Sequence, residues 1–415
     1  MLNKNSQREL CYLVTIDAIE PIVGSDNCEC ARVGGWDVMV RKSTFEVGSS
    51  AIYFEIDSQV DTSKSEFAFL APKHGRIKTQ KYTFGGKNPG FYSQGLLMHP
   101  SDFGWDVQIE PVAGVRTEVV IDDEGKAHYP DDESRFLTQK LGVTYYVAED
   151  NERKAPKVDK YKKMAQRMGK KTNTPLWKWL YRREWGKRVL FFFYGNKKAD
   201  GGVAWPSHIC SKTNVERIQN MPWVINDKNP YVATEKVDGS SCTVTAERKS
   251  FGRIEILVCS RNVVFATGKE QCFYDTNIYL EAFEKYGLKD KIIRILNDYN
   301  LSNVALQMEV YGGKIQKRDY STNEHKIALF HIVTDKVKMP MDKVVEIAEK
   351  YDIPHVPIVC DEYIFPNTIE EVQAFVEGAP SQIDGKPREG IVFYDKATGQ
   401  TYTKFVSPEY LCHWH

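Results

Sequence analysis

The sequence lacks any long apolar run. Its longest hydrophobic stretch, residues 189–194, has six residues and lies between basic side chains, whereas a membrane-spanning helix needs roughly 18. The first five residues also lack the apolar core of a signal peptide. These absences predict a soluble, intracellular and cytoplasmic protein with no membrane partner.

Cysteine and histidine patterns typical of zinc sites are also missing. The nine cysteines form an odd, scattered set, which indicates reduced thiols rather than a disulfide framework. The close pair Cys28 and Cys30 lacks the two-residue spacer and the second pair that a zinc site uses. No HExxH pattern occurs. A histidine-based zinc hydrolase is therefore not expected.

The sequence has no net charge, because 56 Lys and Arg balance 56 Asp and Glu. That balance argues against a nucleic-acid partner only if the charges are mixed evenly. They are not: residues 151–200 hold 16 basic and four acidic side chains, a net charge of +12, so the other 365 residues carry −12. The average conceals a strongly basic segment.

Aromatic residues alternate with cations within this basic segment. The aromatic residues are Trp177, Trp179, Tyr181 and Trp185, and the cations are Lys178, Arg182, Arg183, Lys187 and Arg188. Cations suit phosphate contacts and aromatic rings suit base stacking, so the four cations Arg182, Arg183, Lys187 and Arg188 are candidate RNA ligands. A solvated linker explains the composition equally well, and the two interpretations stay open.

The hydrophobic content of 42% and the aromatic content of 12% are high enough for packed cores. Short β-branched and aromatic runs at 13–16, 36–40 and 51–56, separated by glycine-containing turns, predict strands. A five-stranded OB-type barrel fits residues 1–125, although periodicity alone does not choose it over other β folds. Residues 126–200, acidic and then strongly basic, are predicted to be a linker or an insert.

Residues 201–415 combine strand and helix patterns, which predicts an α+β fold. Strand-like runs occur at 242–246, 254–258 and 327–333. Residues 342–351 place apolar side chains on one helical face. Thr368 and Glu371 form a capping-box pattern that opens a further helix, which Gly378 can end.

Lys236 begins a Lys-Val-Asp-Gly motif. Such a match arises by chance with odds of roughly one in ten in a chain of this length, and Asp-Gly alone indicates a turn. The chemical interpretation is that a deprotonated lysine attacks the α-phosphorus of a nucleotide, with burial, cations or a metal lowering its pKa. Asp238, on the same side of the strand, would hold the metal through water, and Gly239 would let the backbone pass close beneath the nucleotide.

Five further patterns follow this lysine in order. They are Ser260-Arg261-Asn262, residues 306–312 around Glu309, residues 329–332 around Phe330, residues 388–393 around Glu389 and residues 401–406 around Lys404. The ordered set resembles the covalent nucleotidyltransferase superfamily of DNA ligases, RNA ligases and mRNA capping enzymes across residues 234–406. One such match is weak, whereas six in the same order are strong.

Within that superfamily the domain order resembles the Naegleria-type ATP-dependent RNA ligases, which have an N-terminal OB domain. Only 11 residues follow Lys404, too few for the C-terminal OB domain of ATP-dependent DNA ligases and capping enzymes. Residues 33–38, 55–58 and 93–96 resemble the N-terminal OB domain, and residues 213–220 resemble the segment ahead of the lysine. The resemblance implies an OB-type β-barrel followed by a nucleotidyltransferase domain of antiparallel sheets and helices, residues 201–415.

The resemblance also implies an activity. The expected enzyme is an ATP-dependent RNA ligase that uses Mg²⁺ or Mn²⁺ and acts as a monomer on nicked or broken RNA, duplex included. It would form a lysyl-AMP, transfer the AMP to a 5′-phosphate, and seal that end to a 3′-hydroxyl.

A role follows for each motif residue. The resemblance implies that Lys236 is the nucleophile and that Asp238, Glu309 and Glu389 hold the metal. It implies that Glu235 contacts the adenine amino group, that Phe330 stacks on adenine, and that Arg261 contacts the ribose or the end phosphate. Lys404 is implied to bind the α-phosphate and Arg217 to contact the departing pyrophosphate, while Gly239, Glu309 and Glu389 also border the nucleotide. The plainer alternatives are a turn lysine, structural carboxylates, a core phenylalanine and a helix-surface arginine. The last motif has one lysine where many relatives have two, so the phosphate contact of the second lysine stays open, and a cation such as one from the basic segment is a candidate to replace it.

Two rival functions remain. One is a DNA nick ligase, and the other is a non-catalytic RNA-binding protein that kept the fold. The presence of the lysine, both glutamates and Lys404 together argues against the second.

Overall fold

The computed structural model describes residues 1–3, 8–86, 90–112, 115–121, 127–128, 135–146, 180–181, 183, 187, 203–265, 272, 274 and 276–414. Residues 1–146, 206–261 and 272–415 form one compact unit, and residues 147–205 and 262–271 form another. Arg183 and Lys187 of the basic segment are described. Two other candidate RNA ligands, Arg182 and Arg188, lie outside the described residues.

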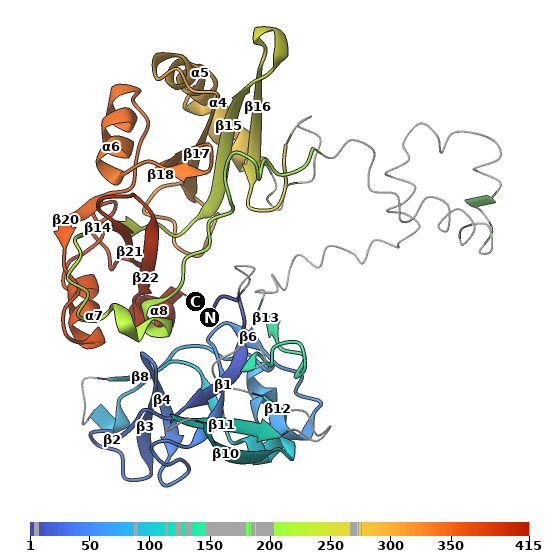
Figure 1. Ribbon diagram of the computed structural model, residues 1–415, viewed down its shortest axis with the longest axis vertical. Helices are drawn as coiled ribbons and strands as arrows, with labels where there is room; N and C mark the ends of the chain where they lie inside the picture. Colours follow the sequence, from blue (N-terminus) through green and yellow to red (C-terminus); the bar gives the residue numbers. More distant parts are fainter. Residues whose placement is uncertain are drawn as a thin grey trace. The chain divides into compact units, whose positions relative to one another are not determined.

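The N-terminal part of the first unit consists of short antiparallel strands (Figure 1). Their bounds are β1 Cys11–Thr15, β2 Ala18–Pro21, β3 Cys28–Val33, β4 Trp36–Arg41, β5 Ser50–Phe54, β6 Ser58–Gln59, β7 Gln80–Tyr82, β8 Phe91–Ser93, β9 Leu96–Met98, β10 Asp106–Val112, β11 Val115–Ile121, β12 Ala127–His128 and β13 Thr144–Tyr145. The three predicted strands overlap β1, β4 and β5. In β4, Trp36, Val38 and Val40 are buried and alternate with less buried residues, the period of a strand with one face on a core.

Two apolar clusters fill this part. One surrounds Phe54 and Phe67, and the other surrounds Trp36 and Tyr53. Leu411, from the far end of the chain, packs into the second cluster. Val406 belongs to the same cluster, so two residues from outside the N-terminal segment complete the barrel core.

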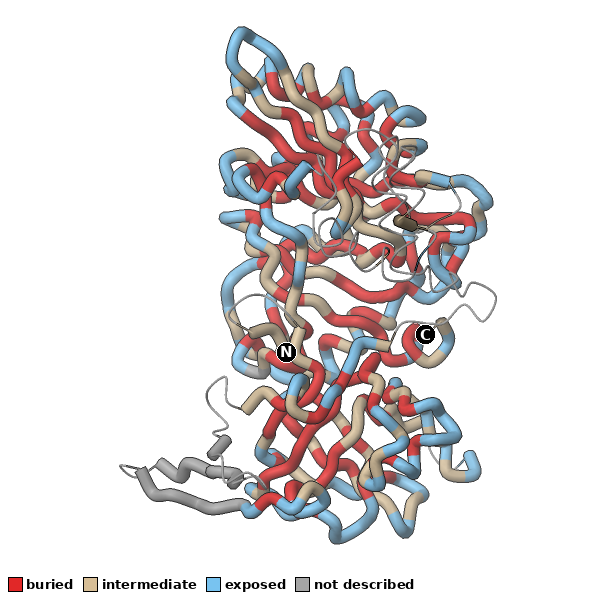
Figure 2. The backbone as a smooth tube through the Cα atoms, turned by 90° about the vertical axis from the view of Figure 1, so that its right-hand side faces the viewer, coloured by how far each residue is buried: buried red, intermediate tan, exposed pale blue. Residues whose placement is uncertain are grey.

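The C-terminal part is built from two antiparallel sheets with helices packed against them (Figure 1). The strands are β14 Tyr231–Lys236, β15 Ser240–Arg248, β16 Ile254–Ser260, β17 Asn303–Gly312, β18 His325–Thr334, β19 Val337–Lys338, β20 Ile358–Tyr363, β21 Gly390–Asp395 and β22 Thr401–Val406, and the helices are α4 Ile278–Lys285, α5 Leu288–Asp298, α6 Met341–Lys350, α7 Ile369–Glu377 and α8 Pro408–Trp414. The first sheet has the order β20-β14-β21-β22 and the second β16-β15-β17-β18-β19. Figure 2 shows that buried residues follow the strands, whereas exposed residues gather in the connections.

The predicted helices are present as α6 and α7. In α6, Val344 and Ala348 are buried as expected. The capping box of α7 is complete: Thr368 Oγ1 accepts from the Glu371 N–H at 3.2 Å, and Glu371 accepts from the Thr368 N–H at 3.1 Å. Gly378 follows the last helical residue with a φ of −68°, so its position requires no left-handed conformation.

The connection between β14 and β15 consists of residues 237–239 and links the two sheets. The expectation that Asp238 lies on the strand with Lys236 is wrong, because β14 ends at Lys236 and Asp238 belongs to the connection. In the part of the chain that the structure describes, no helix is long and apolar enough to cross a membrane.

Candidate active site

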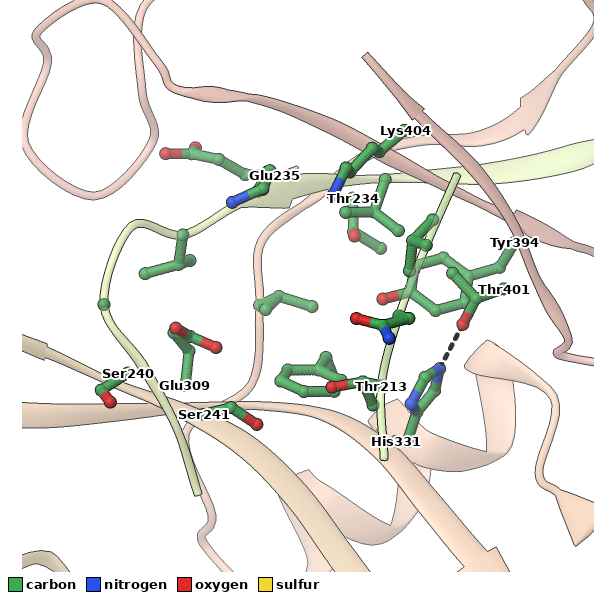
Figure 3. Close-up of a pocket in the computed structure, with 18 of the residues that line it drawn as sticks. Thr213, Thr234, Glu235, Ser240, Ser241, Glu309, His331, Tyr394, Thr401 and Lys404 are labelled. Atoms are coloured by element: carbon green, nitrogen blue, oxygen red, sulfur yellow. Dashed lines mark hydrogen bonds between the residues drawn. The ribbon is translucent and has the colours of Figure 1, made fainter. Parts of the chain in front are cut away.

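A cavity of about 320 Å³ is lined by residues of both C-terminal sheets (Figure 3). The predicted site residues that line it are Glu235, Lys236, Gly239, Arg261, Glu309, Phe330 and Lys404. Glu389 does not line the cavity but contacts Lys236. Val392 of the 388–393 motif also lines the cavity, so the structure brings together residues from all six motifs around one space.

Lys236 and Glu389 form an ion pair at the edge of the cavity. The antiparallel register of β14 and β21 sets Lys236 opposite Gly390, and the Lys236 amine donates to Glu389 Oε1 at 2.6 Å. Burial alone would lower the pKa of Lys236, but the carboxylates of Glu389, Asp238 and Glu309 outweigh burial and raise it. The expectation of a lowered lysine pKa therefore does not hold in this structure, because the nearest partner is an anion.

Glu309 approaches the same lysine from the second sheet. It lies on β17 opposite Ser241 of β15. Burial, with a contribution from the neighbouring carboxylates, raises the pKa of Glu309 to about 8 even though the Lys236 ammonium opposes the rise. A site with several carboxylates and too little positive charge would bind a cation favourably.

Gly239 is required by the close approach of the connection to β17. A Cβ atom at this position would lie 2.2 Å from the carbonyl oxygen of Val310 and 3.0 Å from Cγ of Glu309. The glycine predicted to pass beneath the nucleotide thus passes directly against the strand that carries Glu309.

The carboxylates fit a hard divalent cation held at least partly through water. Oε2 of Glu389 is buried and has no hydrogen-bond partner among the described residues. The described residues contain no group of three His, Cys, Asp or Glu side chains arranged to hold a metal ion. Oxygen donors are the ligands that Mg²⁺ prefers, and Mg²⁺ commonly keeps several waters.

Lys404 lies on β22 beside the segment that precedes the nucleophile. Its N–H donates to the carbonyl of Glu216 at 3.0 Å, and Arg217 and Lys404 form a parallel bridge. Burial, together with the nearby cations Arg217, Lys236 and Arg8, lowers the pKa of Lys404 to about 7. Arg217 and Arg8 are thus cations close enough to Lys404 to affect its pKa.

Arg217 is buried and faces the N-terminal barrel. Its guanidinium carbon lies 5.7 Å from the ring centroid of Trp36, and Nη2 lies 3.7 Å from a carboxylate oxygen of Asp57. Nη1 is buried and finds no hydrogen-bond partner among the described residues. This is not the exposed arginine of the plainer interpretation.

A buried carboxylate joins the barrel to the same segment. Glu55 is fully buried and accepts hydrogen bonds from Tyr12 and from Asn220, each at 3.0 Å. Burial alone would raise the pKa of Glu55, but the Met1 ammonium and Arg8 outweigh burial, and the pKa falls to about 2. The sequence indicated residues 55–58 as part of the barrel but gave no sign of this role.

Glu235 has both carboxylate oxygens engaged by the loop after α7. One accepts from the Ser381 hydroxyl and the other from the Gln382 N–H at 2.8 Å. Arg261 donates to the side chain of Asn214, and the Phe330 ring borders the cavity. The predicted adenine contact of Glu235 stays a prediction, and in this structure the side chain fastens a loop.

Sequence reasoning missed a buried polar network at the cavity wall. His331 contacts Thr401 Oγ1 through Nε2 at 2.6 Å (Figure 3) and Gln307 Oε1 through Nδ1 at 3.1 Å. Lys338 donates to the same threonine hydroxyl at 2.9 Å. Burial lowers the pKa of His331 well below its usual range, so the imidazole is neutral. Its position directly after Phe330 was the available signal.

Comparison with known proteins agrees with this geometry. Residues 229–406 match the family described as RNA ligase, and residues 10–98 match an OB-fold domain. No curated protein matches the chain in sequence. An N-terminal OB-type domain followed by a nucleotidyltransferase domain of antiparallel sheets and helices defines the class of protein. The part of the chain that contains the cavity, residues 229–406, therefore resembles the RNA ligase family.

Solved structures of Naegleria gruberi RNA ligase share the fold over nearly the whole chain. A variant of that ligase with ATP and Mn is 22% identical, has a TM-score of 0.66, and the match covers 97% of this chain and 98% of that chain. The same ligase with PPi is 23% identical, with a TM-score of 0.65 and 98% of each chain covered. A variant with AMP and Mn is 23% identical, with a TM-score of 0.64 and 97% and 98% covered. The predicted α+β fold is confirmed.

Proposed function

We propose that this protein is an ATP-dependent ligase that seals 5′-phosphate and 3′-hydroxyl RNA ends, as a monomer, through a covalent lysyl-AMP. The observation that carries the proposal is that Lys236, Glu309 and Lys404 line one cavity and that Glu389 pairs with Lys236, within a segment that matches the RNA ligase family. The similar structures with ATP or AMP and Mn support the nucleotide and the metal.

In the first step the Lys236 amine attacks the α-phosphorus of ATP, so that an N–P bond forms and pyrophosphate leaves. The amine must first release to solvent the proton that Glu389 stabilises at 2.6 Å. Mg²⁺ or Mn²⁺, when bound, supplies positive charge to Asp238, Glu309 and Glu389. With those carboxylates neutralised, burial dominates the environment of Lys236 and its pKa falls.

Lys404 acts on the phosphates in its protonated form. Its pKa of about 7 would rise next to the phosphate anions, so ATP binding and protonation of Lys404 support each other. Arg217 and Arg8 supply the positive charge expected from a second lysine, and Arg217 Nη1 is the donor available for the pyrophosphate. Such fixed cations stabilise the charge of phosphoryl transfer without reorganisation.

Other residues that line the same cavity would contact the adenine and the ribose of the nucleotide. Phe330 would stack on adenine, Arg261 would contact the ribose or the end phosphate, and Glu235 would position the loop near the base. The AMP then passes to the 5′-phosphate of the RNA, and the 3′-hydroxyl displaces it to make the phosphodiester bond.

Incubation with α-labelled ATP and Mg²⁺ or Mn²⁺ tests the first step. Wild type is expected to take up covalent label, K236A to take up none, and K289A, an exposed change on α5, to label as wild type. If wild type takes up no label with any nucleotide or divalent metal, the enzymatic proposal fails and the non-catalytic RNA-binding alternative is favoured.

The choice of RNA over DNA needs a separate substrate comparison. Two nicked duplexes that differ only in ribose or deoxyribose on the 3′-hydroxyl side should be sealed at clearly different rates, with the ribose end preferred. Equal rates would support a DNA nick ligase instead.

The basic segment is proposed to bind the RNA. Of its four candidate cations, Arg183 and Lys187 are described, and Lys187 Nζ lies 5.8 Å from the ring centroid of Tyr181. Neutralising Arg182, Arg183, Lys187 and Arg188 together should weaken RNA binding more than lysine adenylylation, because phosphate contacts dominate such affinity. Equal loss of both would indicate misfolding, and no loss would support the solvated linker.

A further inference from the structure

Two buried tyrosine hydroxyls bond to Asp238, one to its backbone N–H and the other to its side-chain carboxylate. The Asp238 N–H donates to the Tyr320 hydroxyl at 2.6 Å, and the Tyr410 hydroxyl donates to Asp238 Oδ2 at 2.7 Å. Tyr320 is 3% exposed and Tyr410 is 1% exposed. Asp238 stands in the short connection between the two sheets, where the Tyr320 bond holds its backbone and the Tyr410 bond orients its side chain.

The two tyrosines are themselves held by a buried arginine. Arg318 is fully buried, and its guanidinium carbon lies 4.3 Å from the ring of Tyr320 and 5.5 Å from the ring of Tyr410. It pairs with Asp384 at 2.6 Å and donates to the carbonyl of Pro387 at 2.6 Å. Both rings therefore sit against a fixed cation, which restricts their movement.

Helix α8 places the Tyr410 hydroxyl. Ser407, the residue before this helix, donates its N–H to the carbonyl of Glu389 at 2.9 Å, and its hydroxyl accepts from the Tyr410 N–H at 3.1 Å. Leu411, the next residue on α8, packs into the barrel core. The helix is therefore anchored both to the residue that pairs with the nucleophile and to the N-terminal domain.

We propose that Tyr410 is a positioning residue for lysine adenylylation: its hydroxyl keeps the Asp238 carboxylate oriented for the divalent metal. The proposal rests on the proposed function, because it gives Asp238 the role of a metal-binding carboxylate. A hydroxyl that donates to such a carboxylate limits its rotation and so fixes the direction in which its free lone pairs point. Removing a partner of this kind typically costs 10–100-fold in metal affinity or activity. The last helix would thus act on the active site, although none of its residues lines the cavity.

The test compares Y410F with a matched control. Y363F removes another buried tyrosine hydroxyl, on β20, that has no hydrogen-bond partner among the described residues. In Y410F we expect the Mn²⁺ concentration that half-saturates lysyl-AMP formation to rise about tenfold or more, while the KM for ATP changes little. Y363F should behave as wild type in both respects.

Direct Mn²⁺ binding, measured by electron paramagnetic resonance without ATP, gives a readout that does not depend on activity. Weaker Mn²⁺ binding in Y410F than in Y363F supports the positioning role, and Y320F should shift it in the same direction. If Y410F binds Mn²⁺ and forms lysyl-AMP as Y363F does, the positioning role is refuted. If wild type binds Mn²⁺ but forms no lysyl-AMP, the proposed function fails, and the comparison of Mn²⁺ binding still decides the role of Tyr410.

Discussion

Replacing Lys404 by methionine should abolish adenylylation and at the same time stabilise the folded protein. The side chains are similar in length, but methionine carries no charge. Burial and the neighbouring cations lower the pKa of Lys404 from an ordinary 10.5 to about 7. At about 1.4 kcal/mol per pKa unit, the upper bound on the cost of the buried charge is about 5 kcal/mol. Because Lys404 keeps some contact with solvent at the cavity, we expect a gain of about 2 kcal/mol.

The pH dependence follows from the lowered pKa. Between pH 7 and pH 10.5 the unfolded chain keeps the proton that the folded chain has lost, so stability rises with pH across that window. Below pH 7 both states are protonated and the full cost is present. The advantage of K404M should therefore be greatest near pH 6 and shrink towards pH 9.

Urea unfolding at pH 6, 7.5 and 9 measures this effect. K289M, a change at an exposed position of α5, controls for the general effect of removing a surface charge. The reasoning is refuted if K404M is no more stable than wild type at pH 6, or if its advantage is the same at pH 6 and pH 9.

Three further changes test other parts of the site. E389Q removes the anion beside Lys236, so without metal the lysine should react about tenfold faster with an amine-directed acylating reagent for each pKa unit lost; unchanged modification in peptide mass spectra would contradict the ion-pair argument. G239A forces a Cβ to within 2.2 Å of the Val310 carbonyl and should cost about 1–3 kcal/mol in urea unfolding, and an unaltered midpoint would count against that packing. F330A should weaken ATP binding about fivefold in calorimetry, from a stacking energy of about 1 kcal/mol, and undiminished affinity would exclude stacking.

The sequence predicted the fold class and the residues around the cavity because both depend on local patterns in a fixed order. Lys236, Glu309 and Lys404 each stand in a motif, and strand pairing brings motifs together. The contact of Tyr410 with Asp238 was not predictable in that way, because it joins a helix to a connection 172 residues away through side chains that no motif marks. The raised pKa of Lys236 was missed for a related reason: charge environment depends on the nearest partner, which register decides.

The three-residue connection between β14 and β15 has a mechanical consequence. Lys236 ends a strand of one sheet and Glu309 lies on a strand of the other, so the gap between amine and carboxylate is governed by the angle between the sheets. A small rotation about this connection would alter that gap while leaving the hydrogen-bond ladder of each sheet intact. The hydrogen bonds from His331 and Lys338 of the second sheet to Thr401 of the first cross between the same two sheets, so they would oppose such a rotation and hold the gap at one width.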